Sequence, residues 1–253
     1  MMKVISLCPS LTELVFDLGR GDALIGRTKF CVHPHDRVRD VPSMGGTKNP
    51  RVERIIALQP DLVLMNEEEN RLEDAESLRE AGVRCLTSLP RTTSDTADMV
   101  REIASALDAG TEGERIAHDI ETRAERVAVA ARDRNPVRYA YLIWHQPLMT
   151  LNDDTFVSAM LALPGGVNVF GQLRDRYPAI SEAQLGNAEP DMVLLSSEPF
   201  PFAERHAEEL ANSTGLPRET FRFVDGELLS WHGSRTPAGI DYAERVIGGD
   251  LRG

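Results

Sequence analysis

The chain has 253 residues, enough for one large domain or two small lobes. Its 40 acidic residues outnumber the 28 lysines and arginines. The resulting net charge of −12 argues against a nucleic-acid groove or an anchor to anionic lipid, both of which need clustered positive charge. A hydrophobic content of 42% and a charged content of 27% are typical of globular proteins and exclude wholesale disorder.

The sequence contains no run of 18 apolar residues, so no membrane-spanning helix is predicted. The first residues lead directly into a predicted strand, without the longer apolar region and small-residue cleavage site of a secretory signal. The sequence as written therefore predicts a cytoplasmic protein, or a periplasmic or cell-surface protein if a leader has been removed. Cys8, Cys31 and Cys85 show no CxxC spacing, so neither a disulfide framework nor a structural zinc site is predicted.

Strands and helices alternate along the chain. Strands are predicted at residues 4–7, 24–26, 62–65, 84–87, 138–144, 192–195 and 221–224. Helices intervene, opened by capping boxes at residues 10–13 and 181–184 and by the proline of Thr236-Pro237 in a first turn. Because this alternation is typical of parallel sheets covered by helices, the predicted fold class is α/β.

Two segments about half the chain apart share one pattern. They read VERIIALQPDLVL from residue 52 and SEAQLGNAEPDMVL from residue 181. Each predicts a short helix, a Pro-Asp turn and a buried strand, since proline cannot continue a helix and aspartate suits a turn. Glu68 and Glu198 follow the two Pro-Asp pairs at the same offset. The shared flanks indicate an internal duplication.

The longest predicted helix lies between the repeated halves. It begins at a capping box of Thr111 and Glu114 and ends near Asn135-Pro136. One apolar stripe runs along it, formed by Ile116, Ile120, Ala124, Val127 and Ala131. Two interpretations remain open: a rod that joins two lobes, or a surface helix of one domain.

We predict two parallel-sheet lobes, residues 1–108 and 136–253, joined by a backbone helix at 109–135. In open α/β sheets, ligands bind beyond the carboxyl ends of the strands. The sequence therefore predicts a ligand site in a cleft between the lobes.

Four loops after predicted strands or apolar runs hold most of the rare residue types: FCVHPH from residue 30, MNEEEN from 65, WHQP from 144 and WHGSR from 231. Both tryptophans precede a histidine in such a loop, and an exposed indole is costly unless it meets a partner or ligand. We predict that Phe30, Trp144 and Trp231 form apolar walls around a flat organic or metal-chelate ligand. The alternative for each side chain is a place in the core.

His33, His145 and His232 are candidate metal ligands. No histidine pair shows the HExxH spacing, although His33 and His35 would share a face of an extended segment. Three hypotheses follow: a metal held directly by histidines of three loops, an aromatic-walled pocket for a metal chelate, or one axial histidine on a chelated metal.

Ser234 and Arg235 precede a predicted helix and are candidate anchors for polar ligand groups. The alternative is that Arg235 pairs with one of the many carboxylates. Cys31 beside His33 resembles a nucleophile and base, but no third orienting group and no GxSxG motif accompany them, so catalysis is not predicted. Gly45-Gly46 and Gly165-Gly166 match no phosphate-loop motif and are interpreted as turns.

Five segments in chain order resemble the helical-backbone (class III) substrate-binding proteins of ABC transporters, above all receptors for cobalamin and iron–siderophores. These segments are VISLCPSLTELVFDLG, LIGRTKF, VERIIALQPDLVLM, DTFVSAMLALPGGVNVF and SEAQLGNAEPDMVLL. The resemblance runs over nearly the whole chain. It implies two α/β lobes on a rigid helix, a shallow cleft with aromatic walls, and one surface glutamate per lobe that docks on arginines of a permease.

Matched by segment, Phe30 and Trp231 stand where cobalamin receptors have cleft aromatics. Asn66 stands where those receptors have a tryptophan, which is a departure from a cobalamin site. The resemblance places the docking glutamates at Glu73 and Glu204.

The prediction is a non-enzymatic protein that binds a metal-containing or aromatic small molecule, cobalamin-like or an iron chelate, for ABC-type uptake. The candidate ligand contacts are Phe30, Cys31, Asn66, Trp144, Trp231, Ser234 and Arg235. No intrinsic cofactor and no nucleic-acid partner are expected. The alternatives are an intracellular metal or metal-cofactor handling protein or enzyme that uses Cys31, His33 and His145, and a sensor whose lobes signal to a protein partner.

Overall fold

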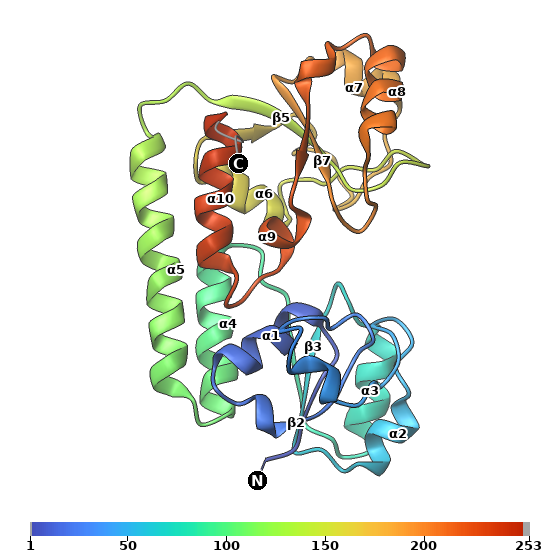
Figure 1. Ribbon diagram of the computed structural model, residues 1–253, viewed down its shortest axis with the longest axis vertical. Coiled ribbons are helices and arrows are strands. Elements are labelled where there is room, and N and C mark those ends of the chain that lie inside the picture. Colours follow the sequence, from blue (N-terminus) through green and yellow to red (C-terminus); the bar gives the residue numbers. More distant parts are fainter. Residues whose placement is uncertain (1, 250–253) are drawn as a thin grey trace. The chain divides into compact units, whose positions relative to one another are not determined.

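The computed structural model describes residues 2–249 and divides into two compact units (Figure 1). Unit 1 comprises the chain up to Pro90, then Ser94–Asp119 and His232–Arg235. Unit 2 comprises Arg91–Thr93, Ile120–Trp231 and the chain from Thr236 on. Within residues 2–249, no helix combines the length and the apolar character that crossing a membrane requires.

Unit 1 is built on a four-stranded parallel sheet in the order β2-β1-β3-β4. The strands are β1 (Val4–Ser6), β2 (Leu24–Arg27), β3 (Leu62–Asn66) and β4 (Cys85–Ser88). The accompanying helices are α1 (Pro9–Asp17), α2 (Val52–Ala57), α3 (Leu72–Glu80) and α4 (Thr93–Ala106), with 3-10 turns at Gly21–Ala23 and Val38–Asp40. Every residue of β1 and β3 is buried, and each strand reads as an unbroken apolar run that ends in one polar residue, Ser6 or Asn66.

Unit 2 repeats the arrangement with a four-stranded parallel sheet in the order β6-β5-β7-β8. Its strands are β5 (Val137–Leu142), β6 (Gly166–Asn168), β7 (Met192–Ser196) and β8 (Phe221–Val224). Its helices are α6 (Phe156–Ala162), α7 (Glu182–Asn187), α8 (Glu204–Thr214), α9 (Gly226–Ser230) and α10 (Thr236–Gly248), with a 3-10 turn at Arg218–Thr220. The shared strand order confirms the predicted α/β class with two parallel sheets.

Helices cover both faces of the unit 2 sheet. Along β5, Tyr139 and Tyr141 pack with residues of α6, α9 and α10, whereas Ala140 and Leu142 pack with residues of α7 and α8. Alternate side chains of a strand point to opposite faces, so each face has its own apolar core. This double burial explains why the strand is apolar without alternation.

Each Pro-Asp turn ties a helix to the sheet in the same way. In unit 1, the carboxylate of Asp61 accepts the backbone N–H of Lys3 at 2.7 Å, and the backbone N–H of Asp61 donates to the Lys3 carbonyl at 2.8 Å. The Lys3 ammonium donates to the carbonyl of Leu58, at the end of α2, at 2.9 Å. The residue before the proline, Gln59, has a φ of 49°. We call this arrangement the clasp.

Unit 2 contains an equivalent clasp. The Asp191 carboxylate accepts the backbone N–H of Arg138 at 2.8 Å, and the Asp191 N–H donates to the Arg138 carbonyl at 2.8 Å. The Arg138 guanidinium donates to the carbonyl of Ala188, at the end of α7, at 2.8 Å. Glu189, before the proline, has a φ of 45°. The duplication inferred from the sequence therefore extends to individual hydrogen bonds.

The long helix α5 (Gly110–Ala131) has 22 residues and confirms the predicted helix between the repeats. It ends four residues earlier than expected, before the Asn135-Pro136 pair that disfavours helix. Its residues up to Asp119 belong to unit 1 and those from Ile120 to unit 2. Arg126 donates to Asp241 at 2.8 Å and to Glu244 at 2.9 Å, which pairs the second part of α5 with α10 (Figure 1). The predicted lobe boundaries at 108 and 136 stay predictions.

Strand β6 was not expected from the sequence, which assigned Gly165-Gly166 to a turn. Gly165, with a φ of 97°, does form a turn. Gly166 begins β6, and a Cβ on it would lie 2.5 Å from the carbonyl oxygen of Leu161. The second glycine therefore permits close approach of strand and helix.

The clasp predicts a measurable loss of stability on Asp191→Ala. Loss of the carboxylate leaves the Arg138 N–H without this acceptor, so the free energy of unfolding should fall by about 1 kcal/mol. Urea unfolding measures the change, with Asp175→Ala in an exposed loop as the control. Equal stability of the two variants would show that the clasp does not stabilise the fold.

Candidate functional site

The carboxyl ends of β5, β7 and β8 lie at one edge of the unit 2 sheet, because the strands are parallel. The loops that follow carry Trp144 and His145 after β5, Glu198 and Phe200 after β7, and Asp225 after β8. Side chains from distant parts of the sequence therefore meet at this edge. It is the position at which open α/β sheets bind ligands.

An aromatic cluster occupies one part of this edge. The Trp144 ring is 40% exposed and meets the Phe200 ring edge-on, with the ring centroids 5.6 Å apart. Its indole N–H donates to the Gln146 carbonyl at 3.1 Å, which holds the ring in place. Trp144 is thus a positioned, exposed aromatic surface, as an apolar wall requires.

His145 lies within this cluster. Its ring stacks on Phe200 at a centroid distance of 5.7 Å, and its Nε2 lies 3.6 Å from an Oε2 of Glu209. The neighbouring ring of His206 is 4.8 Å away. Burial, together with the charges of Arg205 and His145, lowers the pKa of His206. His145 therefore has aromatic and carboxylate neighbours within its own unit.

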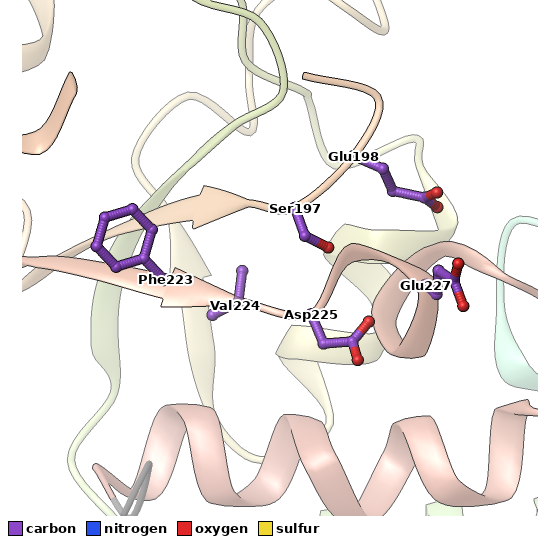
Figure 2. Close-up of a pocket in the computed structure, with 6 residues that line it drawn as sticks. All are labelled: Ser197, Glu198, Phe223, Val224, Asp225 and Glu227. Carbon is purple, nitrogen blue, oxygen red and sulfur yellow. The ribbon is translucent and has the colours of Figure 1, made fainter. Parts of the chain in front are cut away.

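A pocket of about 480 Å³ lies at the carboxyl ends of β7 and β8 (Figure 2). It is lined by Ser197, Glu198, Phe223, Val224, Asp225 and Glu227. Three of these six residues carry carboxylates, and none of the described residues that line it is basic. The Cα of Gly226 lies close to the Glu198 side chain, since a Cβ added at Gly226 would lie 2.7 Å from the Glu198 Cγ.

Glu198 is fixed at the pocket by two donors. Its Oε1 accepts the indole N–H of Trp231 at 2.8 Å and the hydroxyl of Ser230 at 3.0 Å. Trp231 is only 9% exposed, so the structure does not present its ring as an exposed wall. Its evident role is to orient the Glu198 carboxylate.

The carboxylates make this region electronegative. The Oδ1 of Asp225 accepts the Leu228 N–H at 3.1 Å and caps α9. Burial, with the charges of Glu198 and Asp225 added, raises the pKa of the Tyr141 phenol, which donates to the Ser196 hydroxyl. Burial, and then the Asp225 charge, raise the pKa of Tyr242.

In unit 1, Phe30 and Cys31 follow β2 but differ sharply in exposure. Phe30 is 50% exposed, and the Lys29 ammonium lies 4.8 Å from its ring centroid. Cys31 is 1% exposed, and its sulfur accepts the Thr12 hydroxyl at 3.0 Å. Burial raises the pKa of the Cys31 thiol. Phe30 is thus an accessible aromatic surface, whereas Cys31 is held within the structure.

Asn66 is buried and shapes the loop after β3. Its Oδ1 accepts the N–H groups of Glu68 at 2.9 Å and Glu69 at 3.2 Å, and its Nδ2 donates to the Ser88 carbonyl at 3.0 Å. Asn70, which sequence reasoning did not single out, accepts the Asn66 N–H at 2.9 Å. The Asn-x-x-x-Asn spacing around three glutamates is the sequence signal from which these hydrogen bonds within the loop could have been inferred.

The loop at 232–235 is bound to α1 of the same unit. The His232 Nε2 lies 3.4 Å from the Ser10 hydroxyl. Arg235 forms a bidentate pair with Glu13, at 2.9 and 2.7 Å. This is the alternative considered for Arg235, pairing with a carboxylate. Burial raises the pKa of Asp17, and the Ser234 hydroxyl opposes that rise.

The three candidate metal ligands are divided between the two units. His33 lies in unit 1 with its ring 4.4 Å from that of His35, His232 is in unit 1, and His145 is in unit 2. Among residues 2–249, no group of three or more His, Cys, Asp or Glu side chains is arranged to hold a metal ion. A role for one of these histidines on a chelated metal stays a prediction.

Both predicted docking glutamates are exposed in the first turn of a helix. Glu73 lies in α3, beside Leu72, which is 65% exposed. Glu204 begins α8 and accepts the Arg218 Nε–H at 3.1 Å. The two positions are similar in fold, but Glu204 already has a cationic partner.

Comparisons with known proteins agree on one group. A family described as "Periplasmic binding protein" matches residues 4–217. The vitamin B12-binding protein of Vibrio cholerae is 25% identical over 96% of this chain and 87% of its own length. That of Vibrio parahaemolyticus is 28% identical over 77% of this chain and 70% of its own length.

Solved structures show the same fold. The periplasmic vitamin B12 binding protein BtuF of Vibrio cholerae superposes with a TM-score of 0.84 at 21% identity, covering 99% of this chain and 98% of that one. The periplasmic heme-binding protein RhuT from Roseiflexus sp. RS-1 gives 0.84 at 23% identity, covering 99% of both chains.

The buried thiols predict slow reaction with a disulfide reagent. Burial raises the pKa of Cys8 to about 12, so roughly one molecule in ten thousand carries its thiolate at pH 8. Cys85 is only half-buried and should react first with Ellman's reagent, whereas Cys8 and Cys31 should react only after unfolding. Cys85→Ser should abolish the fast phase. Rapid reaction of all three thiols in the native protein would contradict the structure.

Proposed function

The chain belongs to the periplasmic binding protein family, and we propose that it binds a metal-bearing macrocycle for delivery to an ABC permease. The cargo is cobalamin-like or a heme-like iron chelate. The observation that carries this proposal is the match over 96% of the chain to a protein named for vitamin B12 binding. Structural neighbours named for B12 and for heme support a cargo of this class.

The aromatic surface of unit 2 is the proposed contact with the macrocycle. Flat, polarisable rings stack well on exposed indole and phenyl faces. Trp144 presents such a face and is braced by Phe200 and the Gln146 carbonyl. Phe30, on the loop after β2, is an exposed aromatic side chain of unit 1. That the ligand lies between the lobes, and that His33, His145 or His232 binds its metal, stay predictions from the sequence.

The cargo is bound without being transformed. A nucleophilic cysteine needs a lowered pKa and access to solvent. Cys31 has neither, because burial raises its pKa and leaves it 1% exposed. This supports binding over the alternative of an enzyme that uses Cys31.

Delivery to a permease would use one glutamate of each unit. Glu73 presents its carboxylate at the start of α3, and Glu204 does so at the start of α8. An arginine of the permease would replace Arg218 as the partner of Glu204. Membership of this family supports a location on the periplasmic side, where such a protein meets its permease.

Truncating Trp144 tests the proposed contact. Isothermal titration with cyanocobalamin, heme and a ferric chelate should identify at least one ligand, and Trp144→Ala should weaken its affinity about 10-fold or more. Val167→Ala, an exposed apolar residue on β6, serves as the control and should bind normally. The proposal fails if no ligand binds more tightly than about 100 µM. It also fails if both variants bind like the parent protein.

A further inference from the structure

We propose that His206 is a positioning residue for ligand binding, which acts through Phe200 on the exposed indole of Trp144. The inference rests on the proposed function, because it concerns the contact that Trp144 makes with the ligand. His206 lies in the first turn of α8 and is only 5% exposed, so its role is to hold other side chains. Sequence reasoning did not single it out.

The imidazole ring of His206 contacts the side chain that supports Trp144. The Phe200 ring meets the His206 ring at a centroid distance of 5.1 Å and the Trp144 ring at 5.6 Å, edge-on in both cases. Because aromatic pairs prefer particular mutual orientations, the place of one ring constrains the next. The orientation of Trp144 therefore depends on His206 through one intermediate ring.

Phe200 is half-buried on a loop, where a side chain needs support from a more rigid element. Its other ring contacts are with Phe202 at 4.9 Å and His145 at 5.7 Å. Both of these residues, like Trp144, lie in connecting segments, whereas His206 belongs to a helix. His206 is thus the side chain through which the aromatic cluster is attached to regular structure.

A hydrogen bond to the backbone fixes the orientation of the His206 ring. Its Nδ1 accepts the N–H of Ala203, the residue before α8, at 2.9 Å. The Arg205 Nε lies 3.1 Å from the other ring nitrogen, Nε2. Alanine has no side-chain acceptor with which to cap a helix, so the imidazole supplies the acceptor that the start of α8 needs. The ring therefore faces Phe200 from a fixed base.

The two roles of His206 can be separated by substitution. Glutamine is favoured at this third helical position, because its side chain can accept the N–H of the residue before the helix. His206→Gln therefore retains an acceptor for Ala203 but removes the ring that contacts Phe200. His206→Phe retains an aromatic ring and removes the acceptor.

Ligand affinity should follow the ring and not the acceptor. The probe is whichever of cyanocobalamin, heme and the ferric chelate binds the parent protein in titration calorimetry. His206→Gln should weaken its affinity about 5-fold, because Trp144 loses the fixed orientation that stacking requires. His206→Phe should bind within about 2-fold of the parent. Val246→Ala, in the core on the opposite face of the unit 2 sheet, controls for a general loss of stability and should bind normally.

A double-mutant cycle tests whether His206 acts through Trp144. In a Trp144→Ala background, His206→Gln should weaken binding by less than about 2-fold, since the contact that it positions is already absent. An undiminished effect in that background would show that His206 acts through another group, such as His145, whose ring is 4.8 Å away, and would overturn the inference.

The fluorescence of Trp144 reports its positioning without any ligand. The chain has two tryptophans, so Trp231→Phe leaves Trp144 as the single indole. In this background, time-resolved anisotropy should show a larger amplitude of fast indole motion in His206→Gln and parent-like motion in His206→Phe. A residue that only stabilised the fold would alter unfolding and leave this amplitude unchanged.

The outcomes keep the two proposals apart. If the parent protein binds a macrocycle and His206→Gln binds it equally well, the inference is overturned and the binding function stands. The same conclusion follows if His206→Phe binds as weakly as His206→Gln, or if the motion of Trp144 is unchanged in His206→Gln. If none of the three ligands binds the parent protein, the proposed function fails and the inference falls with it.

Discussion

The hydrogen bond between the aspartate of each Pro-Asp turn and the backbone of the first strand sets the arrangement of both sheets. It aligns Lys3 with Asp61 and Arg138 with Asp191, one residue before the paired positions Val4–Leu62 and Tyr139–Met192. Because register in a parallel pair determines where both strands end, the same bond determines where the following loops begin. The cation of Lys3 or Arg138 then satisfies a carbonyl at the end of the preceding helix.

The functional edge of unit 2 follows from that register. β5, β7 and β8 are neighbours in the sheet, so Trp144, Glu198 and Asp225 come from distant segments yet follow adjacent strand ends. Trp144 presents an exposed indole after β5, and two donors hold the Glu198 carboxylate after β7. In unit 1, the polar side chains at the equivalent edge, Asn66 and Asn70, are used to brace the loop. The two units share a fold but differ in the chemistry of their edges.

Local patterns predicted the fold well because each has a local cause. The Pro-Asp turns, the apolar strands and the apolar stripe of α5 can be read from neighbouring residues. Strand β6 was missed because Gly166 permits a close contact with the Leu161 carbonyl and does not form a turn. Site residues were harder to assign. Arg235 and Glu13 lie 222 positions apart, so their pairing could not be read from the sequence. Trp231 was expected to be exposed, but its indole is directed to Glu198, a partner 33 positions away.

Hydrogen–deuterium exchange with and without a saturating macrocycle, cyanocobalamin or heme according to which binds in the titration, tests most directly whether the carboxyl edge of the unit 2 sheet binds the ligand. The account predicts that the ligand slows exchange in peptides covering residues 143–149, 197–203 and 225–231, while the Pro-Asp turn at 189–192, at the opposite ends of the strands, is unaffected. Ligand binding that leaves those three loops unprotected would contradict it.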